Sequence, residues 1–173
     1  IVFEEFRKDV GEEYIDMLLM DAQIHRYSER IIYVRDSVTE KIPAFESIIA
    51  NTAFYIDERC STARAGSECI RFGPTFLDNL SDSELEFVMI HEIMHIAFNH
   101  NKRRAGRNLR IYNIACDVVI NSIILEIYND DISRITLDKY GESAHTTPDG
   151  REGRCFSVDE VYAMFADNMK KCA

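Results

Sequence analysis

The sequence predicts an α+β domain in which helices flank a small sheet. Two long stretches with helical spacing of apolar residues lie on either side of two short β-forming segments, and two more helix signals follow toward the carboxyl end. The 173 residues are 46% hydrophobic and 29% charged, which is typical of a single globular domain. We therefore expect one domain over 1–173, with its core at about 45–165. The chain begins with Ile1, which predicts a fragment of a longer protein.

The amino-terminal half predicts one helix and two strands before the central helix. Apolar residues recur at helical spacing from Glu12 to about Tyr33. Residues 52–57 (TAFYID) and 69–72 (CIRF) are short and rich in β-forming residues, so each predicts a strand. The stretch between them is small and polar, with Gly66 as the expected turn, and it predicts that the two strands pair as a hairpin.

The central helix carries the clearest signals. Ser81 and Glu84 have the spacing of a capping box, which predicts the start of a helix. The residues that follow, 85–98, are apolar on almost every side, as in helices that lie at the centre of a domain.

Two more helices are expected after it. A polar, basic stretch containing Gly106 predicts a break, and apolar spacing then predicts a helix over about 109–128. The long segment 129–156 has no clear period and is rich in glycine. Ser157 and Glu160 form a second capping-box pattern, which predicts a short helix through about Asn168.

The middle of the central helix holds the sequence HEIMH, an HExxH motif at residues 91–95. His91 and His95 lie one turn apart on the same face, so both imidazoles can bind one Zn²⁺ ion. Glu92 can accept a proton from the water that attacks a carbonyl group. The alternative interpretation is two core histidines and a surface glutamate. Since such groups are costly to bury without a partner, we expect a zinc site.

A third protein ligand is needed, and two residues compete for this role. Asp117 lies in the next predicted helix, at the centre of a polar stripe that also contains Asn113 and Asn121. The stripe either faces the histidines or faces solvent. His100 follows His95 closely and would point away from the ligand face unless the helix ends before it. We expect Asp117 as the ligand and Asn121 as a residue that orients one histidine, with His100 as the alternative ligand.

The motif and its surroundings resemble a known family. The runs HEIMHIAFNH at 91–100 and YNIACDVVIN at 112–121 resemble a bacterial and phage zinc metallopeptidase domain of the zincin type, often found upstream of a von Willebrand A-like domain. The strand at 69–72 and the capped helix from Ser157 also match its pattern. The resemblance covers roughly 45–165.

This resemblance implies a zincin-like fold, with an active-site helix beneath a small sheet whose edge strand binds an extended substrate. We expect the 69–72 strand to be that edge. The two motif histidines are implied as zinc ligands and Glu92 as the catalytic base. The wider zinc-peptidase pattern of a ligand glutamate followed four residues later by an aspartate does not decide between Asp117 and His100.

The expected function is a zinc-dependent peptidase that hydrolyses peptide or protein substrates with Glu92 as general base. Tyr112, Tyr140 and His145 could each donate a hydrogen bond to the oxyanion, although each is more often a structural residue. The alternative is a non-catalytic, metal-stabilised binding or scaffold module that works with a partner domain. Metal-dependent hydrolysis of a substrate other than a peptide is a third hypothesis. A structural site does not need Glu92, which favours the enzyme.

Charge and composition argue against other functions. The net charge of −10 repels phosphate backbones and anionic lipids, and no stretch approaches the roughly 20 apolar residues of a membrane span. We therefore expect no nucleic-acid or membrane partner, with the basic cluster at 102–110 as the one feature that favours nucleic acid. Five cysteines without a CxxC pair predict reduced thiols and a cytoplasmic protein, although Cys60 and Cys69 could be bridged.

Overall fold

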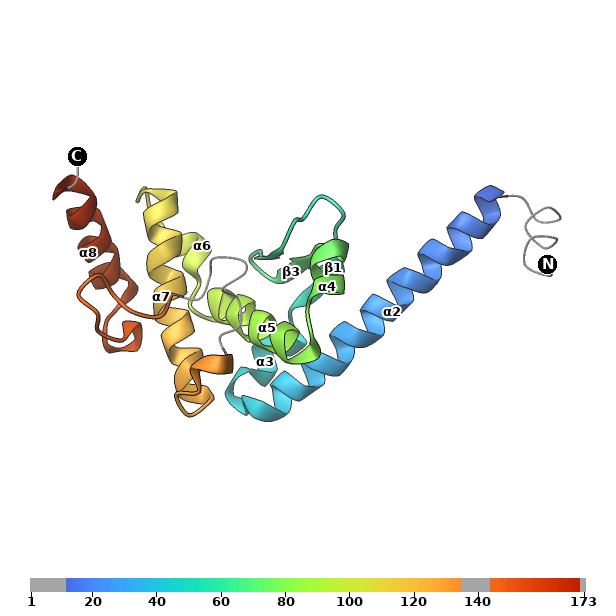
Figure 1. Ribbon diagram of the computed structural model, residues 1–173, viewed down its shortest axis with the longest axis horizontal. Helices are drawn as coiled ribbons and strands as arrows, with labels where there is room; N and C mark the ends of the chain where they lie inside the picture. Colours follow the sequence, from blue (N-terminus) through green and yellow to red (C-terminus); the bar gives the residue numbers. More distant parts are fainter. Residues whose placement is uncertain (1–11, 135–143, 172–173) are drawn as a thin grey trace.

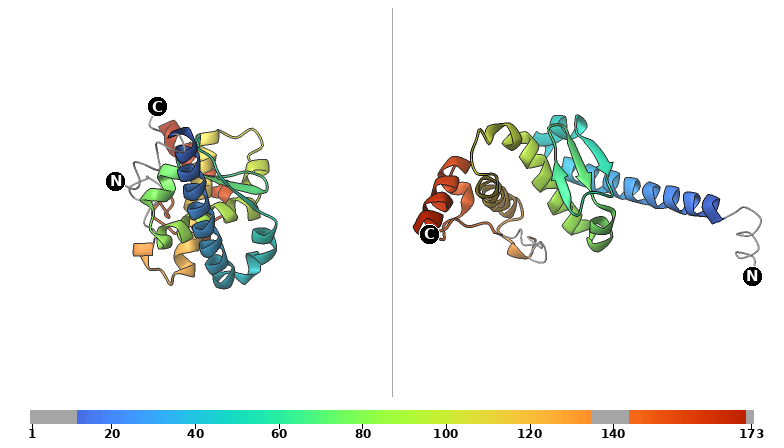
Figure 2. Two further views of the ribbon diagram at one scale, coloured as in Figure 1. Left: turned by 90° about the vertical axis from the view of Figure 1, so that its right-hand side faces the viewer. Right: turned by 90° about the horizontal axis from the view of Figure 1, so that it is seen from above.

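The computed structural model describes residues 12–134 and 144–171 and confirms the mixed α+β class, with mostly helical structure around a three-stranded sheet (Figure 1). The helices are α2 (Glu12–Lys41), α3 (Glu46–Ala50), α4 (Pro74–Asn79), α5 (Asp82–Ala97), α6 (His100–Arg103), α7 (Leu109–Ile127) and α8 (Val158–Lys171). The strands are β1 (Ala53–Ile56), β2 (Ala63–Ala65) and β3 (Cys69–Phe72). Seen from above, α8, α7, α5 and the sheet follow one another (Figure 2).

Helix α2 is longer than the sequence predicted, because it continues past Tyr33 to Lys41. The apolar stripe of Tyr27 and Ile31 continues at helical spacing through Val34 and Val38, and all four side chains are buried. The amino-terminal half of α2 instead projects from the body (Figure 1). The apolar side chains exposed on that half are Met17, Leu18, Leu19, Met20 and Ile24.

The predicted hairpin is wrong, because β1 and β3 pair in parallel, with Ala53 opposite Cys69. Strand β2 pairs antiparallel with β3, and the strand order is β1-β3-β2. The chain reverses direction twice between β1 and β3, so these two strands run the same way. Strand β3 is consequently the middle strand rather than the expected edge, and the two edges are β1 and β2.

Helix α5 begins as the capping box predicted. Glu84 donates its backbone N–H to Ser81 Oγ at 3.3 Å, and its carboxylate accepts from the Ser81 N–H at 2.7 Å. The helix ends at Ala97, where Asn99 adopts the left-handed conformation with φ of 56°. Most of its apolar residues are fully buried, between the sheet and α2 on one side and α7 on the other.

Helix α7 belongs to two apolar clusters. Ile120, Ile124 and Leu125 pack in the main core with α5. Tyr112, Ala115, Cys116, Val118 and Val119 pack against Val158 and Val161 of α8. The second capping box is also present, since Ser157 Oγ accepts from the Glu160 N–H at 3.3 Å. Because α7 is held on both sides, its remaining face is fixed relative to α5.

Two features concern membrane insertion and the oxidation state of the cysteines. None of the helices in the described ranges is long and apolar enough to cross a membrane. The cysteines that the structure describes, Cys60, Cys69, Cys116 and Cys155, are free thiols, while Cys172 lies outside the described residues.

A buried carboxylate joins three helices at the end of α5 that lies away from the histidines. Glu86 of α5 is 8% exposed and accepts hydrogen bonds from Ser37 Oγ at 2.8 Å and Tyr128 Oη at 2.7 Å. It also forms an ion pair with Lys41. Burial alone would raise the pKa of Glu86, but the bonds from these three residues outweigh it and lower the pKa from its ordinary value of 4.5.

We expect Glu86→Ala to lower the free energy of unfolding by about 2–3 kcal/mol at pH 7, because it leaves the charge of Lys41 and two partly buried hydroxyl groups without their partner. Urea unfolding would measure the loss. A lowered pKa contributes stability above the unfolded value, so the difference between the two proteins should shrink as the pH falls below about 4.5. Glu126→Ala, an exposed change on α7, is the control, and equal losses for the two variants would contradict the prediction.

Candidate metal centre

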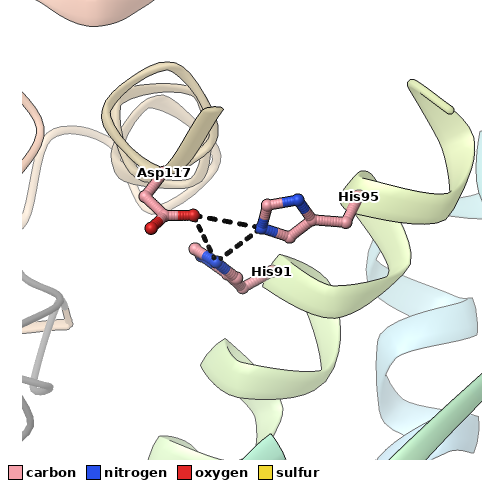
Figure 3. A group of neighbouring side chains, drawn as sticks. All are labelled: His91, His95 and Asp117. Carbon is pink, nitrogen blue, oxygen red and sulfur yellow. Dashed lines mark hydrogen bonds and ion pairs between the residues drawn. The ribbon is translucent and has the colours of Figure 1, made fainter. Parts of the chain in front are cut away.

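Three side chains from two helices converge between α5 and α7 (Figure 3). His91 and His95 point from α5 toward α7, and the carboxylate of Asp117 points back toward both rings. The two Nε2 atoms are 3.0 Å apart. Asp117 Oδ1 lies 3.4 Å from Nε2 of His91 and 3.2 Å from Nε2 of His95. The three atoms form a nearly equilateral triangle.

The size of this triangle fits a zinc ion. Tetrahedral zinc holds its nitrogen and oxygen ligands at about 2.0–2.1 Å, so two ligand atoms on one ion lie about 3.3 Å apart. The three observed separations lie within a few tenths of an ångström of this value. Two imidazoles and one carboxylate are also a donor set that suits zinc, and they leave one of its four positions for water or substrate.

Asn121 fixes which nitrogen of His91 carries the proton. Its amide Nδ2 donates to the backbone carbonyl of Ala144 at 2.9 Å, so its Oδ1 faces His91 Nδ1, also at 2.9 Å. An oxygen there can only accept, and the Nδ1–H of His91 must therefore donate to it. The lone pair of His91 Nε2 is left facing Asp117 and His95. This is the contact that the sequence prediction required of Asn121.

His100 lies behind His95 rather than beside Asp117. Because α5 ends at Ala97, the chain turns and brings His100 Nδ1 within 3.1 Å of His95 Nδ1. The helix thus ends early enough for His100 to approach, yet its ring meets the nitrogen of His95 that faces away from the triangle. Burial, with smaller contributions from neighbouring charges, lowers the pKa of His100 to about 4.

The carboxylate of Asp117 is ionised at neutral pH. Burial opposes the charged form, but the neighbouring imidazoles of His91 and His95 outweigh it and hold the pKa of Asp117 well below its usual range. The neighbouring Cys116 is on the other side of α7, where burial raises the pKa of its thiol to about 12. Cys116 therefore remains a neutral thiol within the packed interface with α8.

Glu92 lies beside the triangle in a hollow of about 190 Å³. Strand β2 lines one side of this hollow with Ala63, Arg64 and Ala65. Asn101 closes one end, since its amide donates to the carbonyls of Ala65 and Gly66 at 3.3 and 3.2 Å. Sequence reasoning missed β2, because a run of alanine and arginine carries no β-forming signal.

A second hollow of about 230 Å³ lies on the far side of His95. It shares His95, Asn101 and Asn113 with the first, and is also lined by His100, Arg104, Leu109 and Tyr112. A larger, mostly apolar hollow of about 690 Å³ lies between α2 and β1 and includes none of these side chains.

The three residues considered for the oxyanion are placed differently. Tyr112 is 2% exposed and its ring packs against His100. His145 Nδ1 contacts the carboxylate of Glu152 at 3.1 Å, and His145 lines neither hollow beside the triangle. Tyr140 lies outside the described residues.

Comparison with known families gives one match. The sequence model of the family described as "Putative metallopeptidase domain" matches residues 26–131, more than half of the chain. The matched range includes both helices of the triangle and all three strands. No curated protein and no solved structure matches the chain.

Proposed function

The chain belongs to this family of metallopeptidase domains, and from that premise we propose that it is a zinc-dependent peptidase of the zincin type. The triangle formed by His91, His95 and Asp117 carries the proposal, because its dimensions suit one tetrahedral zinc ion. A zinc ion held there would polarise the substrate carbonyl and make a water molecule more acidic.

Each remaining residue has a separate role in this proposal. Glu92, beside the triangle and within the same hollow, accepts the proton of the attacking water and later passes it to the leaving amine. Asn121 keeps the Nε2 lone pair of His91 directed at the zinc position. His100 does the same for His95, by accepting from its Nδ1–H.

The substrate is a peptide or protein that binds along β2. This strand is an edge of the sheet and borders the hollow that contains Glu92. An extended peptide can add to such an edge through main-chain hydrogen bonds, which would place its backbone next to the triangle. The substrate-binding strand expected from the sequence at 69–72 is thereby replaced by the strand next to it.

The cellular setting is part of the same proposal. The free thiols suit a reducing, cytoplasmic compartment. The family resemblance of the 91–121 region adds a von Willebrand A-like domain of the full-length protein as the proposed partner.

The test combines metal analysis with cleavage. We expect the purified protein to bind one zinc ion per chain and to cleave members of a peptide library, to stop cleaving on chelation, and to recover with added zinc. The double variant His91→Ala/His95→Ala should bind no zinc. Stoichiometric zinc in that variant would contradict the proposed site, and zinc binding by the wild type without cleavage of any peptide would favour a scaffold module.

A further inference from the structure

The arginine and lysine side chains that the structure describes fall into two groups. Those that form an ion pair with a carboxylate are Arg26, Arg30, Arg35, Lys41, Arg59, Arg71, Arg107, Arg151 and Arg154. Those that form none within the described part of the chain are Arg64, Lys102, Arg103, Arg104 and Arg110. We call the second group the unpaired cations.

Two of the unpaired cations line the hollows next to the metal centre. Arg64 lines the hollow that contains Glu92, and Arg104 lines the second hollow beyond His95. Lys102 and Arg103 precede Arg104 on α6, and Arg110 is in the first turn of α7. This is unexpected for a chain with a net charge of −10, in which carboxylates outnumber cations. Each hollow next to the triangle is therefore lined by one unpaired arginine.

The local structure does not explain why an arginine occupies position 64. In the β2–β3 ladder it lies directly opposite Arg71, and two like charges facing each other across a sheet are unfavourable. Arg71 is compensated, since its guanidinium lies 3.6 Å from Asp57 and over the ring of Tyr55. Arg64 is exposed and has no such partner among the described residues.

The dipole of α5 does not account for the cations of α6 either. Lys102 and Arg103 do lie in the last turn of α6, but a helix of four residues has only a small dipole of its own. The dipole favours positive charge within the last turn of a helix. Helix α5 ends at Ala97, and the cations at 102–104 come after the turn at Asn99. Like Arg64, they remain available to a ligand that carries its own negative charge.

We propose that the substrate of this site is an acidic peptide, with Asp or Glu side chains on both sides of the cleaved bond. The proposal rests on the peptidase function. One carboxylate pairs with Arg64 along β2, and another pairs with Arg104 in the second hollow. Arginine suits this role because its guanidinium can bind a carboxylate through two parallel hydrogen bonds. The surrounding cations attract such peptides, which the rest of the acidic chain would repel.

Nucleic acid is the other anion that unpaired cations could bind. The peptide is favoured because the cations lie around an edge strand and a HExxH turn, and because a long polyanion would meet the repulsion of the whole chain. The test below includes an oligonucleotide for this reason.

The experiment measures binding and cleavage separately. Labelled peptides of one length, rich in Glu, Gln or Lys, are titrated into zinc-loaded Glu92→Gln protein and followed by fluorescence anisotropy. The same peptides are compared by kcat/KM with Glu92 present. We expect the Glu peptide to bind and react at least about tenfold better than the Lys peptide, and the preference to decline at high salt. Arg64→Glu and Arg104→Glu should each remove most of this preference.

Arg26→Glu is the control, because it makes the same change of charge at an exposed residue of α2 outside both hollows. A loss of preference in this control as large as in Arg64→Glu would overturn the inference, as would equal binding of the three peptides or tighter binding of a single-stranded oligonucleotide. Cleavage that requires Glu92 but ignores peptide charge overturns this inference alone. Preferential binding of the Glu peptide without any cleavage would overturn the peptidase function, and with it the assignment of a cleaved substrate, while the charge preference of the two hollows would stand.

Discussion

Glu92→Gln is expected to lower kcat at least about a thousandfold while the protein keeps its zinc and its fold. The amide has nearly the shape of the carboxylate, so the hollow beside β2 and the packing of α5 should not change. It cannot accept the proton of the attacking water, and a general base typically contributes a factor of 10²–10⁴ to the rate. Turnover of a library-selected peptide, zinc content and thermal unfolding together measure the three parts of the prediction.

Glu126→Gln is the control for this change. Glu126 is exposed on α7, and the same loss of one negative charge there should leave kcat within about a factor of two. If Glu92→Gln remained active, another group would have to be the base. If it lost its zinc, the carboxylate would belong among the ligands.

Asp117→Ala is expected to weaken zinc binding much more than His100→Ala does. The Asp117 oxygen completes the triangle with both Nε2 atoms, whereas His100 contacts only the outward nitrogen of His95. Loss of a residue that merely orients a ligand typically reduces metal affinity by about 10–100-fold. Loss of Asp117 should exceed that range. Competition with a zinc-binding dye measures both affinities.

A conservative variant separates coordination from packing. Asp117→Asn keeps the size of the side chain but loses its charge, so it should also bind zinc poorly while unfolding at nearly the wild-type urea concentration. The reverse order of affinities, with His100→Ala the weaker binder, would assign the third ligand to His100. The same result would leave Asp117 as an orienting residue.

The core of the candidate site could be predicted because its signals are local. One helical turn separates His91 from His95, so their shared face follows from helix geometry alone. Asp117 and Asn121 were identifiable as a polar stripe within an apolar helix, and that stripe does face the histidines. The place of His100 was not predictable, since it depends on the left-handed turn at Asn99. Neither could the sequence reveal Arg64 as a neighbour of Glu92.

The helices were likewise easier to predict than the sheet. Capping boxes mark the starts of α5 and α8 at single residues. Strand pairing depends instead on how many times the chain reverses direction between the strands. The three residues of β2 carry no β-forming signal, so the sequence does not reveal this strand or the second reversal. The short helices α3 and α4 contain too few turns for an apolar period to emerge.

The bridge made by Asn121 links the metal centre to a segment distant in sequence. One end of its amide meets His91 and the other meets the carbonyl of Ala144, which begins the second described range. Zinc bound to His91 would strengthen that chain of hydrogen bonds, and by thermodynamic reciprocity any partner that held the Ala144 segment in place would raise zinc affinity by the same factor. Metal binding and the position of this segment are then coupled through a single pair of hydrogen bonds.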